Sequence, residues 1–259
     1  MEDLEKATYP PVGKCIYCGS NKDLRREHII PYALGSNTFL PKATCPNCAR
    51  ITGCFEQEVL RGSMWAVRVI RNLKSRTKHK DAPKTKLLTL TKEGRDQRVE
   101  LPLDEYPVLL SFPVFTLPGY LDPGGYTQGI RITGNVTIRF GSPPETILTR
   151  FGATGLKITQ NDKPTSFARM IAKIAYSMAY AKGALETIKG NPTVISSILG
   201  VRDDIGLWVG TLQAPHKAQS GLLHRISLIE DRKLGLLLSE VQLFADSQTP
   251  NYIVILGHL

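Results

Sequence analysis

The stretches of sequence that decide the fold are CIYC at residues 15–18 and CPNC at residues 45–48. In each stretch two cysteines stand three positions apart, so a tight turn of the backbone places both sulfur atoms on the same side. Two such pairs can present four thiolates to one tetrahedral Zn²⁺ ion. A site closed by four sulfurs has no open position for water, so we expect the zinc to be structural and to stabilise the fold. The expected zinc ligands are Cys15, Cys18, Cys45 and Cys48.

Cysteine usage in this chain is typical of a metal site in a reducing compartment. Four of the five cysteines belong to the two pairs, whereas a disulfide framework favours an even count in a small secreted chain. The fifth, Cys54, lies on a predicted helix and is expected to be a small buried hydrophobe. The N-terminus has acidic residues where a signal peptide needs a basic start, and no apolar run is long enough to span a membrane. These features predict a soluble, cytoplasmic protein.

Between the two cysteine pairs, Glu27 and His28 stand next to one another in an otherwise apolar run that is typical of a strand. A histidine in this setting can act as a general base on water, and the neighbouring carboxylate can bind a hard divalent cation such as Mg²⁺. Such a cation would stabilise the leaving oxygen of a phosphodiester. The alternative is structural: the two residues form a local hydrogen-bonded pair or cover the zinc site.

The run EHIIP at residues 27–31, followed by ALGS and then CPNC, resembles HNH endonucleases, in which DHIIP and a glycine turn precede a CxxC pair. The resemblance is to the bacterial and phage members with four zinc-binding cysteines, and it extends over residues 15–60. It implies a ββα-metal fold with His28 as the general base. It also implies that Glu27, in the place of the usual aspartate, is a ligand of the catalytic metal, and that the four paired cysteines hold the structural zinc.

Two positions depart from the family pattern. Ala49 stands directly after the last paired cysteine, where the family usually has a histidine or asparagine as second metal ligand, and alanine cannot bind a metal. The middle asparagine of the pattern is also out of register, because Leu40 and Pro41 take its place and Asn37 lies nearby. Glu56 lies about two helical turns beyond Ala49 and on the same face. It is either a replacement ligand of the catalytic metal or a solvated surface acid.

The overall charge favours a polyanionic partner. The chain has 33 lysine and arginine residues against 23 aspartate and glutamate residues, which gives a formal net charge of +10. Beside a phosphodiester-cleaving site, the basic run on and after the predicted helix would follow a nucleic-acid backbone without reading its sequence. A solvated helix face is the alternative explanation. The expected nucleic-acid-binding residues are Arg61, Arg68, Arg71, Lys74, Arg76, Lys78 and Lys80.

Composition and periodicity predict an α+β fold in four parts. These are a leader at residues 1–14, the HNH-type zinc module at residues 15–76, a basic linker at residues 77–86, and an α+β domain of unknown role at residues 87–259. Helical periodicity follows the second cysteine pair over residues 49–75, with Gly62 as a break. The α+β domain contains one long amphipathic helix, which begins after Pro164 and is closed by Gly190. Strands are predicted at residues 106–117, 130–140, 222–229, 234–244 and 252–256.

Three hypotheses about function follow. The first is a metal-dependent endonuclease that hydrolyses DNA phosphodiester bonds, with His28 activating water and with Glu27 and Glu56 holding one Mg²⁺ or similar ion; RNA is an alternative substrate. The second is a nucleic-acid-binding or regulatory protein of the HNH fold that has lost catalysis through Ala49. The third is a zinc module that only stabilises the chain, while the α+β domain binds a small molecule or a protein. The target, nicking as opposed to double-strand cleavage, and the oligomeric state stay open.

Overall fold

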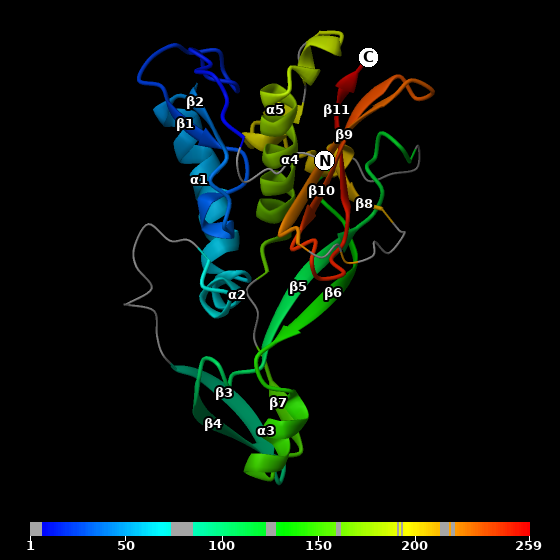
Figure 1. The fold of residues 1–259 in the computed structure, drawn as a ribbon. Helices are drawn as coiled ribbons and strands as arrows, with labels where there is room; N and C mark the ends of the chain where they lie inside the picture. The colour runs from blue at the N-terminus through cyan, green and yellow to red at the C-terminus, as the bar shows by residue number, and fades with distance from the viewer. Residues whose placement is uncertain are drawn as a thin grey trace.

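The chain contains helices together with antiparallel sheets and is therefore α+β as predicted. A main body and a smaller lobe are joined by a long β-hairpin (Figure 1). The computed structural model of the chain describes residues 7–73, 85–122, 128–158, 162–190, 192, 194–212, 218 and 221–259.

The N-terminal part of the body is a β-hairpin followed by a helix. The strands β1 and β2 pair antiparallel, with Glu27 opposite Leu40 and His28 opposite Phe39. The helix α1 begins directly after its N-cap Cys45, because a proline at its first position suits the first helical turn, and it ends at the predicted break, Gly62. The bounds are Arg25–His28 for β1, Tyr32–Leu34 for a 3₁₀ turn, Phe39–Thr44 for β2, Pro46–Arg61 for α1 and Trp65–Ile70 for α2. We call residues 15–61 the cysteine module.

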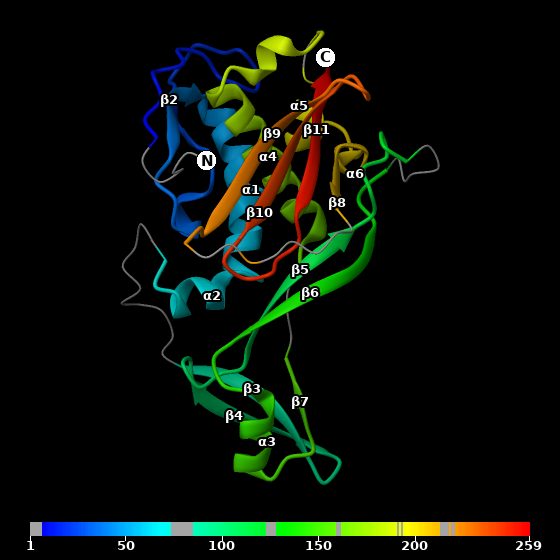
Figure 2. The ribbon, with the colours of Figure 1, turned by 45° about the vertical axis from the view of Figure 1, so that its right-hand side comes forward.

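The predicted amphipathic helix is α4, Pro164–Ala181, and it lies at the centre of the body. It packs against α1 on one side and against the strands of the main sheet on the other (Figures 1 and 2). Almost every side chain from Phe167 to Ala179 is buried for this reason. A 3₁₀ turn at Ala184–Thr187 follows the helix before Gly190. The helix therefore joins the cysteine module to the rest of the body.

The main sheet has four antiparallel strands in the order β8-β11-β10-β9. Strands β9, β10 and β11 lie at the three C-terminal positions that the sequence predicts. Two short helices, α5 and α6, also pack against α4. The bounds are Val194–Ile198 for α5, Ile205–Trp208 for α6, Val209–Thr211 for β8, His224–Asp231 for β9, Leu236–Leu243 for β10 and Tyr252–His258 for β11.

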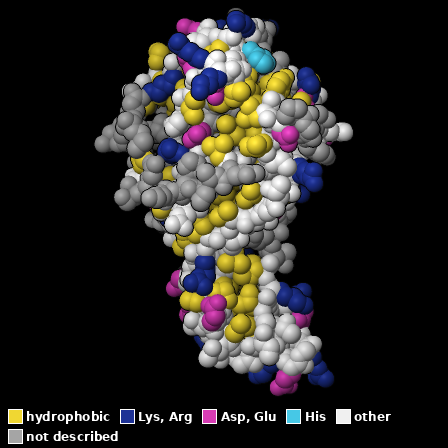
Figure 3. All heavy atoms as spheres, turned by 90° about the vertical axis from the view of Figure 1, so that its right-hand side faces the viewer, with side chains coloured by type: hydrophobic (Ala, Val, Ile, Leu, Met, Phe, Trp, Pro, Cys, Tyr) yellow, Lys and Arg dark blue, Asp and Glu magenta, His cyan; other side chains and the backbone are white. Residues whose placement is uncertain are grey.

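The smaller lobe consists of a three-stranded sheet, in the order β4-β3-β7, and the helix α3. The hairpin of β5 and β6 connects it to the body, and hydrophobic side chains appear in patches over the body and the connection on the face turned right in Figure 1 (Figure 3). The bounds are Thr85–Lys92 for β3, Arg95–Pro102 for β4, Val108–Phe115 for β5, Ile132–Phe140 for β6, Pro144–Phe151 for α3 and Gly155–Lys157 for β7.

Two hydrophobic cores stabilise the molecule. The larger one runs from Cys15 to Leu256 and so contains side chains of the cysteine module together with those of α4 and the main sheet. The smaller one fills the lobe, and Ala66 of α2 contributes to it. The division between a zinc module and an α+β domain stays a prediction.

The two remaining predicted segments lie partly outside the described residues. In the leader, the backbone amides of Val12 and Gly13 donate to the carbonyls of Pro41 and Lys42 beside β2. Of the predicted linker at residues 77–86, only the last two residues are described, and they begin β3. Within the described residues, none of the helices has the length and apolar character that crossing a lipid bilayer requires.

Candidate functional site

The four paired cysteines converge as the sequence predicts. Their sulfur atoms all lie within 4.8 Å of one another, and three of the four residues are buried, Cys18 being the exposed one. The first pair lies in the turn before β1, and the second lies at the start of α1, where Cys45 is the N-cap. The hairpin between them brings the two turns together. Cys54 is exposed, contrary to the expectation that it is buried, because it lies on the outer side of α1.

The geometry of the cluster fits a tetrahedral metal. Zn–S bonds of about 2.3 Å in a tetrahedron place neighbouring sulfurs about 3.8 Å apart. The Sγ atoms of Cys18 and Cys45 are separated by 3.6 Å. The donor set of four sulfurs is the one that structural zinc sites use. These residues can therefore hold a metal ion, and zinc fits the site.

The electrostatics of the cluster favour a thiolate at Cys45. Burial alone would raise the pKa of this thiol, but hydrogen bonds with the backbone of Cys48 and with the other thiols outweigh burial and lower the pKa to about 7. Burial raises the pKa of the Cys48 thiol. Because metals bind thiolates, the cluster contains a ligand that is already partly ionised near neutral pH.

A second cluster of charged residues lies deeper in the body, and we call Glu27, Glu56 and Lys173 the acid–lysine cluster. Glu27 extends from β1, Glu56 from α1 and Lys173 from α4. The Nζ atom of Lys173 lies 2.8 Å from Oε1 of Glu27 and 3.0 Å from Oε1 of Glu56. The ammonium group also donates a hydrogen bond to the backbone carbonyl of His28. The two acids that the sequence singles out therefore meet, but around a lysine from a distant helix.

Burial makes this cluster electrostatically strong. The Lys173 side chain is 1% exposed, that of Glu27 6% and that of Glu56 18%. Burial alone would lower the pKa of Lys173, but the two carboxylates outweigh burial and raise it. The Tyr17 hydroxyl donates to Oε1 of Glu27 at 3.2 Å, and its own pKa is raised well above the usual value by burial and by the Glu27 charge. The cluster is a closed ion-pair network.

The acid–lysine cluster does not fit the divalent ion that the resemblance implies. Mg²⁺ binds carboxylate oxygens at about 2.0–2.1 Å, and it would need the space between the two Oε1 atoms. The Lys173 ammonium fills that space and brings its own positive charge. The predicted catalytic Mg²⁺ at Glu27 and Glu56 thus receives no support from these contacts.

His28 lies on the other face of β1 from Glu27, because successive side chains of a strand alternate. Its half-buried ring lies beside the rings of Tyr32 and Phe39, with centroid distances of 5.6 and 5.7 Å. The guanidinium of Arg26, an exposed residue, lies over the same Phe39 ring at 5.6 Å. Arg26 and His28 therefore share one face of the hairpin, away from the acid–lysine cluster.

The predicted nucleic-acid-binding residues differ in what they contact. Arg61 is exposed at the end of α1. Arg68 is half-buried and donates to the carbonyls of Ala33 and Leu60, both at 2.9 Å. These contacts stabilise the turn between the strands and the end of α1. The other predicted residues Lys74, Arg76, Lys78 and Lys80 lie outside the described residues.

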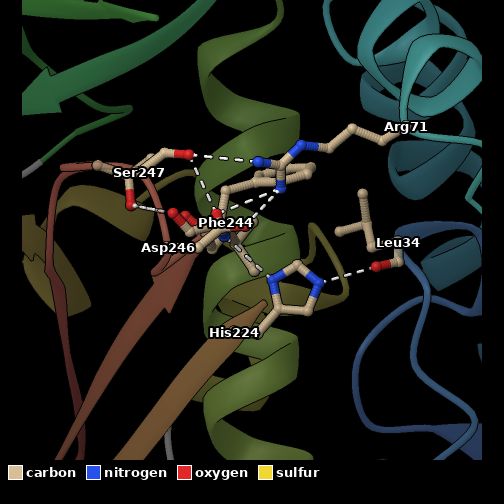
Figure 4. A network of polar contacts seen from close by, with 8 residues as sticks. Leu34, Arg71, His224, Phe244, Asp246 and Ser247 are labelled. Carbon is tan, nitrogen blue, oxygen red and sulfur yellow. Dashed lines mark hydrogen bonds and ion pairs between the residues drawn. The ribbon is translucent and has the colours of Figure 1, made fainter. Parts of the chain in front are cut away.

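Arg71 belongs to a polar network that joins the α2 end to the main sheet (Figure 4). It pairs with Asp246 at 2.9 Å, and its guanidinium lies 5.4 Å from the ring of Phe244. In the same network, His224 accepts a hydrogen bond from the Phe244 amide at Nδ1, and its Nε2 lies 2.8 Å from the carbonyl of Leu34. The Nε2 atom therefore carries the proton that it donates to Leu34. His224 begins β9, inside the strand predicted at residues 222–229, and it is buried.

Sequence reasoning missed Lys173, although a signal is present. It is the one charged residue in the buried stretch MIAKIAYSMA at residues 170–179. A lysine there must be paired, because an unpaired ammonium is too costly to bury. The pattern indicates a buried partner of opposite charge, but it does not say which acid that partner is.

Comparison with known proteins identifies no family for this chain. No protein-family model, curated protein or solved structure matches the chain. The residues make an α+β protein with a four-cysteine site that can hold a metal ion such as zinc, beside a buried acid–lysine cluster.

Proposed function

We propose that the protein is an endonuclease of the HNH type that hydrolyses phosphodiester bonds in nucleic acid, with His28 as the general base. The observation that carries the proposal is the position of His28. It ends β1 of a strand–strand–helix unit, it is half-exposed, and four clustered cysteines fix the unit on both sides. This is the arrangement that the resemblance to HNH endonucleases implies for the catalytic histidine. DNA is the proposed substrate, with RNA as the alternative.

The residues around His28 supply the parts of a hydrolysis. The imidazole takes a proton from water, the resulting hydroxide attacks phosphorus, and the bond from phosphorus to the leaving oxygen breaks. Arg26, on the same face of the hairpin, offsets the negative charge that develops on the phosphoryl oxygens. The leaving oxygen takes a proton from solvent. No step passes through Glu27 or Glu56, since Lys173 pairs with both.

Binding is proposed to depend on basic residues of the cysteine module. Arg68 and Arg71 make contacts inside the protein, so they are poor candidates for phosphate binding. The module itself exposes six basic side chains, which can neutralise phosphates without reading sequence. They are Lys22, Arg25, Arg26, Lys42, Arg50 and Arg61.

A second candidate function is nucleic-acid binding without cleavage. Two observations favour it: Ala49 cannot bind a metal, and Lys173 neutralises the acids that a metal-dependent enzyme would use. The exposed basic residues would serve this function equally well. The two candidates differ only in what His28 does.

The test is cleavage of supercoiled plasmid by zinc-loaded protein, in metal-depleted buffer and with added Mg²⁺ or Mn²⁺. We expect nicking by the wild type, loss of nicking in His28→Ala, and no loss in His258→Ala, an exposed histidine at the C-terminal end of β11. Zinc content is measured in all three proteins so that a loss of the cysteine site is not mistaken for a loss of catalysis. Salt-sensitive DNA binding without nicking under any condition would reject the nuclease and leave the binding protein.

A further inference from the structure

We propose that Lys173 takes the place of the catalytic divalent cation, so that the acids of the module are satisfied by the chain itself and no second metal binds there. Lys173 Nζ has three hydrogen-bond donors, and its contacts are Oε1 of Glu27, Oε1 of Glu56 and the carbonyl of His28. All three partners belong to the cysteine module.

The ammonium lies beside Glu27, which the resemblance to HNH endonucleases implies as a ligand of the catalytic metal. It lies between carboxylates from β1 and α1, the strand and helix whose residues hold the catalytic ion in the family that the module resembles. The distances of 2.8 and 3.0 Å are those of charge-assisted hydrogen bonds and leave no room for an ion at coordination distance from both oxygens. A divalent ion beside a fixed ammonium would also be repelled.

The charges agree with this assignment. A buried carboxylate and a half-buried one without a cation would be costly, and a divalent ion would neutralise both. Lys173 neutralises one charge, and the Tyr17 hydroxyl supplies a further hydrogen bond to Glu27. The sequence is consistent with such an exchange, because Ala49 stands where the family usually has another metal ligand. The module therefore lacks the usual ligand at one point and contacts a cationic side chain at another.

The exchange also gives α4 a role in positioning the hairpin. Lys173 contacts the carbonyl of His28 itself, so α4 holds the backbone from which the proposed general base extends. Lys173 is therefore a positioning residue: it is buried beneath the hairpin and does not reach the face on which His28 and Arg26 lie. A metal in the same place would hold the acids but would not connect the module to α4.

The experiment asks whether removing the amine creates a metal site. Mn²⁺ binding is followed by electron paramagnetic resonance in zinc-loaded wild type, Lys173→Ala, Glu56→Gln, the double variant Lys173→Ala/Glu56→Gln, and Lys163→Ala. Lys163 is an exposed lysine at the N-cap of α4 and serves as the matched control. We expect the wild type and Lys163→Ala to bind no Mn²⁺ at this place. Lys173→Ala should gain one Mn²⁺ site, which the double variant loses.

Two outcomes would overturn the proposal: Mn²⁺ binding by the wild type that Glu56→Gln abolishes, or a folded Lys173→Ala that gains no site. If Lys173→Ala folds only when Mn²⁺ is added, the metal replaces the amine and the proposal is supported. If it folds under neither condition, the comparison of wild type with Glu56→Gln decides.

The inference rests on the proposed function only in the choice of the place where a metal would bind. Its test measures metal binding, whereas the nuclease test measures nicking. A protein that never nicks DNA but gains a Mn²⁺ site in Lys173→Ala would reject the nuclease and keep the inference. A protein whose nicking requires Mg²⁺ bound through Glu56 would keep the nuclease and reject the inference.

Discussion

The cysteine module contains two clusters of ionisable side chains that obtain their cations in different ways. The four thiols come from two short turns of the module, and no cationic side chain is among the four residues that converge. The acid–lysine cluster contains Glu27 and Glu56 of the same module, but its cation comes from α4, 145 positions beyond His28. The first cluster can hold a metal ion taken from solution. The second is complete when the chain has folded.

The cysteine module can therefore be stabilised in two ways, by a metal at the four cysteines and by Lys173 at the two acids. Loss of the metal should disrupt the turns before β1 and α1, because these contain the ligands. Loss of Lys173 should disrupt the contact between the module and α4, because the acids of β1 and α1 would remain buried without a cation. The variants below test each source of stability and then two weaker polar contacts between the module side and the main sheet.

The largest effect is expected for Cys45→Ser. Structural zinc in small domains contributes on the order of 10 kcal/mol of binding free energy at neutral pH, and much of this is folding free energy. We expect the variant to lose bound zinc and the fold of the cysteine module. Zinc content and thermal unfolding followed by circular dichroism check this.

Cys54→Ser is the matched control, since Cys54 is exposed and lies outside the cluster. It should retain zinc and unfold at the wild-type temperature. A zinc-free Cys45→Ser protein with wild-type stability would show that the cluster contributes nothing to the fold.

Lys173→Met comes next. Breaking a buried ion pair by removal of one partner typically costs about 3–5 kcal/mol, because the remaining charge is uncompensated. We expect a loss of this size in the free energy of unfolding measured with urea, while zinc stays bound. Lys163→Met, on the exposed end of the same helix, should change stability little.

Removing the charges of the acids should restore part of what Lys173→Met loses. In the triple variant Lys173→Met/Glu27→Gln/Glu56→Gln no buried charge is left without a partner, so its stability should exceed that of Lys173→Met. Equal stabilities would mean that the lysine acts through packing alone.

The same contrast explains what the sequence could and could not predict. The four-cysteine site was found because the spacing within each cysteine pair is local, and the resemblance adds the strand and helix that join the two pairs. Gly62 indicated where α1 ends, but the prediction that Gly190 closes the long helix is wrong, because α4 ends at Ala181. The sequence pattern indicated β9, β10 and β11 of the main sheet but not the short strand β8. Lys173 could not be assigned a partner, because the pairing depends on how α4 packs against α1, which no local pattern encodes.

The smaller lobe was missed for a related reason. β4 carries the sequence RDQRVELP, in which charged residues dominate and most side chains are exposed. It is a strand because β3 pairs with it along its full length, not because its own residues alternate. Tertiary pairing overrides local preference here. Tertiary contacts also explain Arg68 and Arg71, which were predicted to face nucleic acid. Their partners lie in other elements, and the local basic run does not reveal them.

His224 tests a case in which burial excludes a charge. Burial lowers its pKa from 6.5 to about 4, in spite of the opposing effects of the Leu34 carbonyl and Asp246. Above pH 6.5 the histidine is neutral in both states, so its contribution is complete there. Between pH 6.5 and 4, His224 binds a proton in the unfolded chain but not in the folded protein. The free energy of unfolding therefore falls as pH falls, by up to about 3 kcal/mol.

Urea unfolding at a series of pH values between 7.5 and 4.5 measures this effect. In His224→Gln, which keeps an amide donor for Leu34, the loss of stability on acidification should be smaller than in the wild type. Parallel curves for the two proteins would show that another group accounts for the acid sensitivity.

The smallest effect is expected where a similar ion pair is less buried. Arg71 and Asp246 are 2.9 Å apart, as close as Lys173 and Glu27, but their side chains are 23% and 31% exposed. Water competes for both charges, so a double-mutant cycle with Arg71→Met and Asp246→Asn should give a coupling of only about 1 kcal/mol. The pair Arg139–Glu145, at 3.7 Å and more exposed, should give less. The coupling at Arg71–Asp246 could instead equal the stability lost in Lys173→Met. In that case burial would not set the strength of these ion pairs, and the acid–lysine cluster would bind its cation no more strongly than a surface pair does.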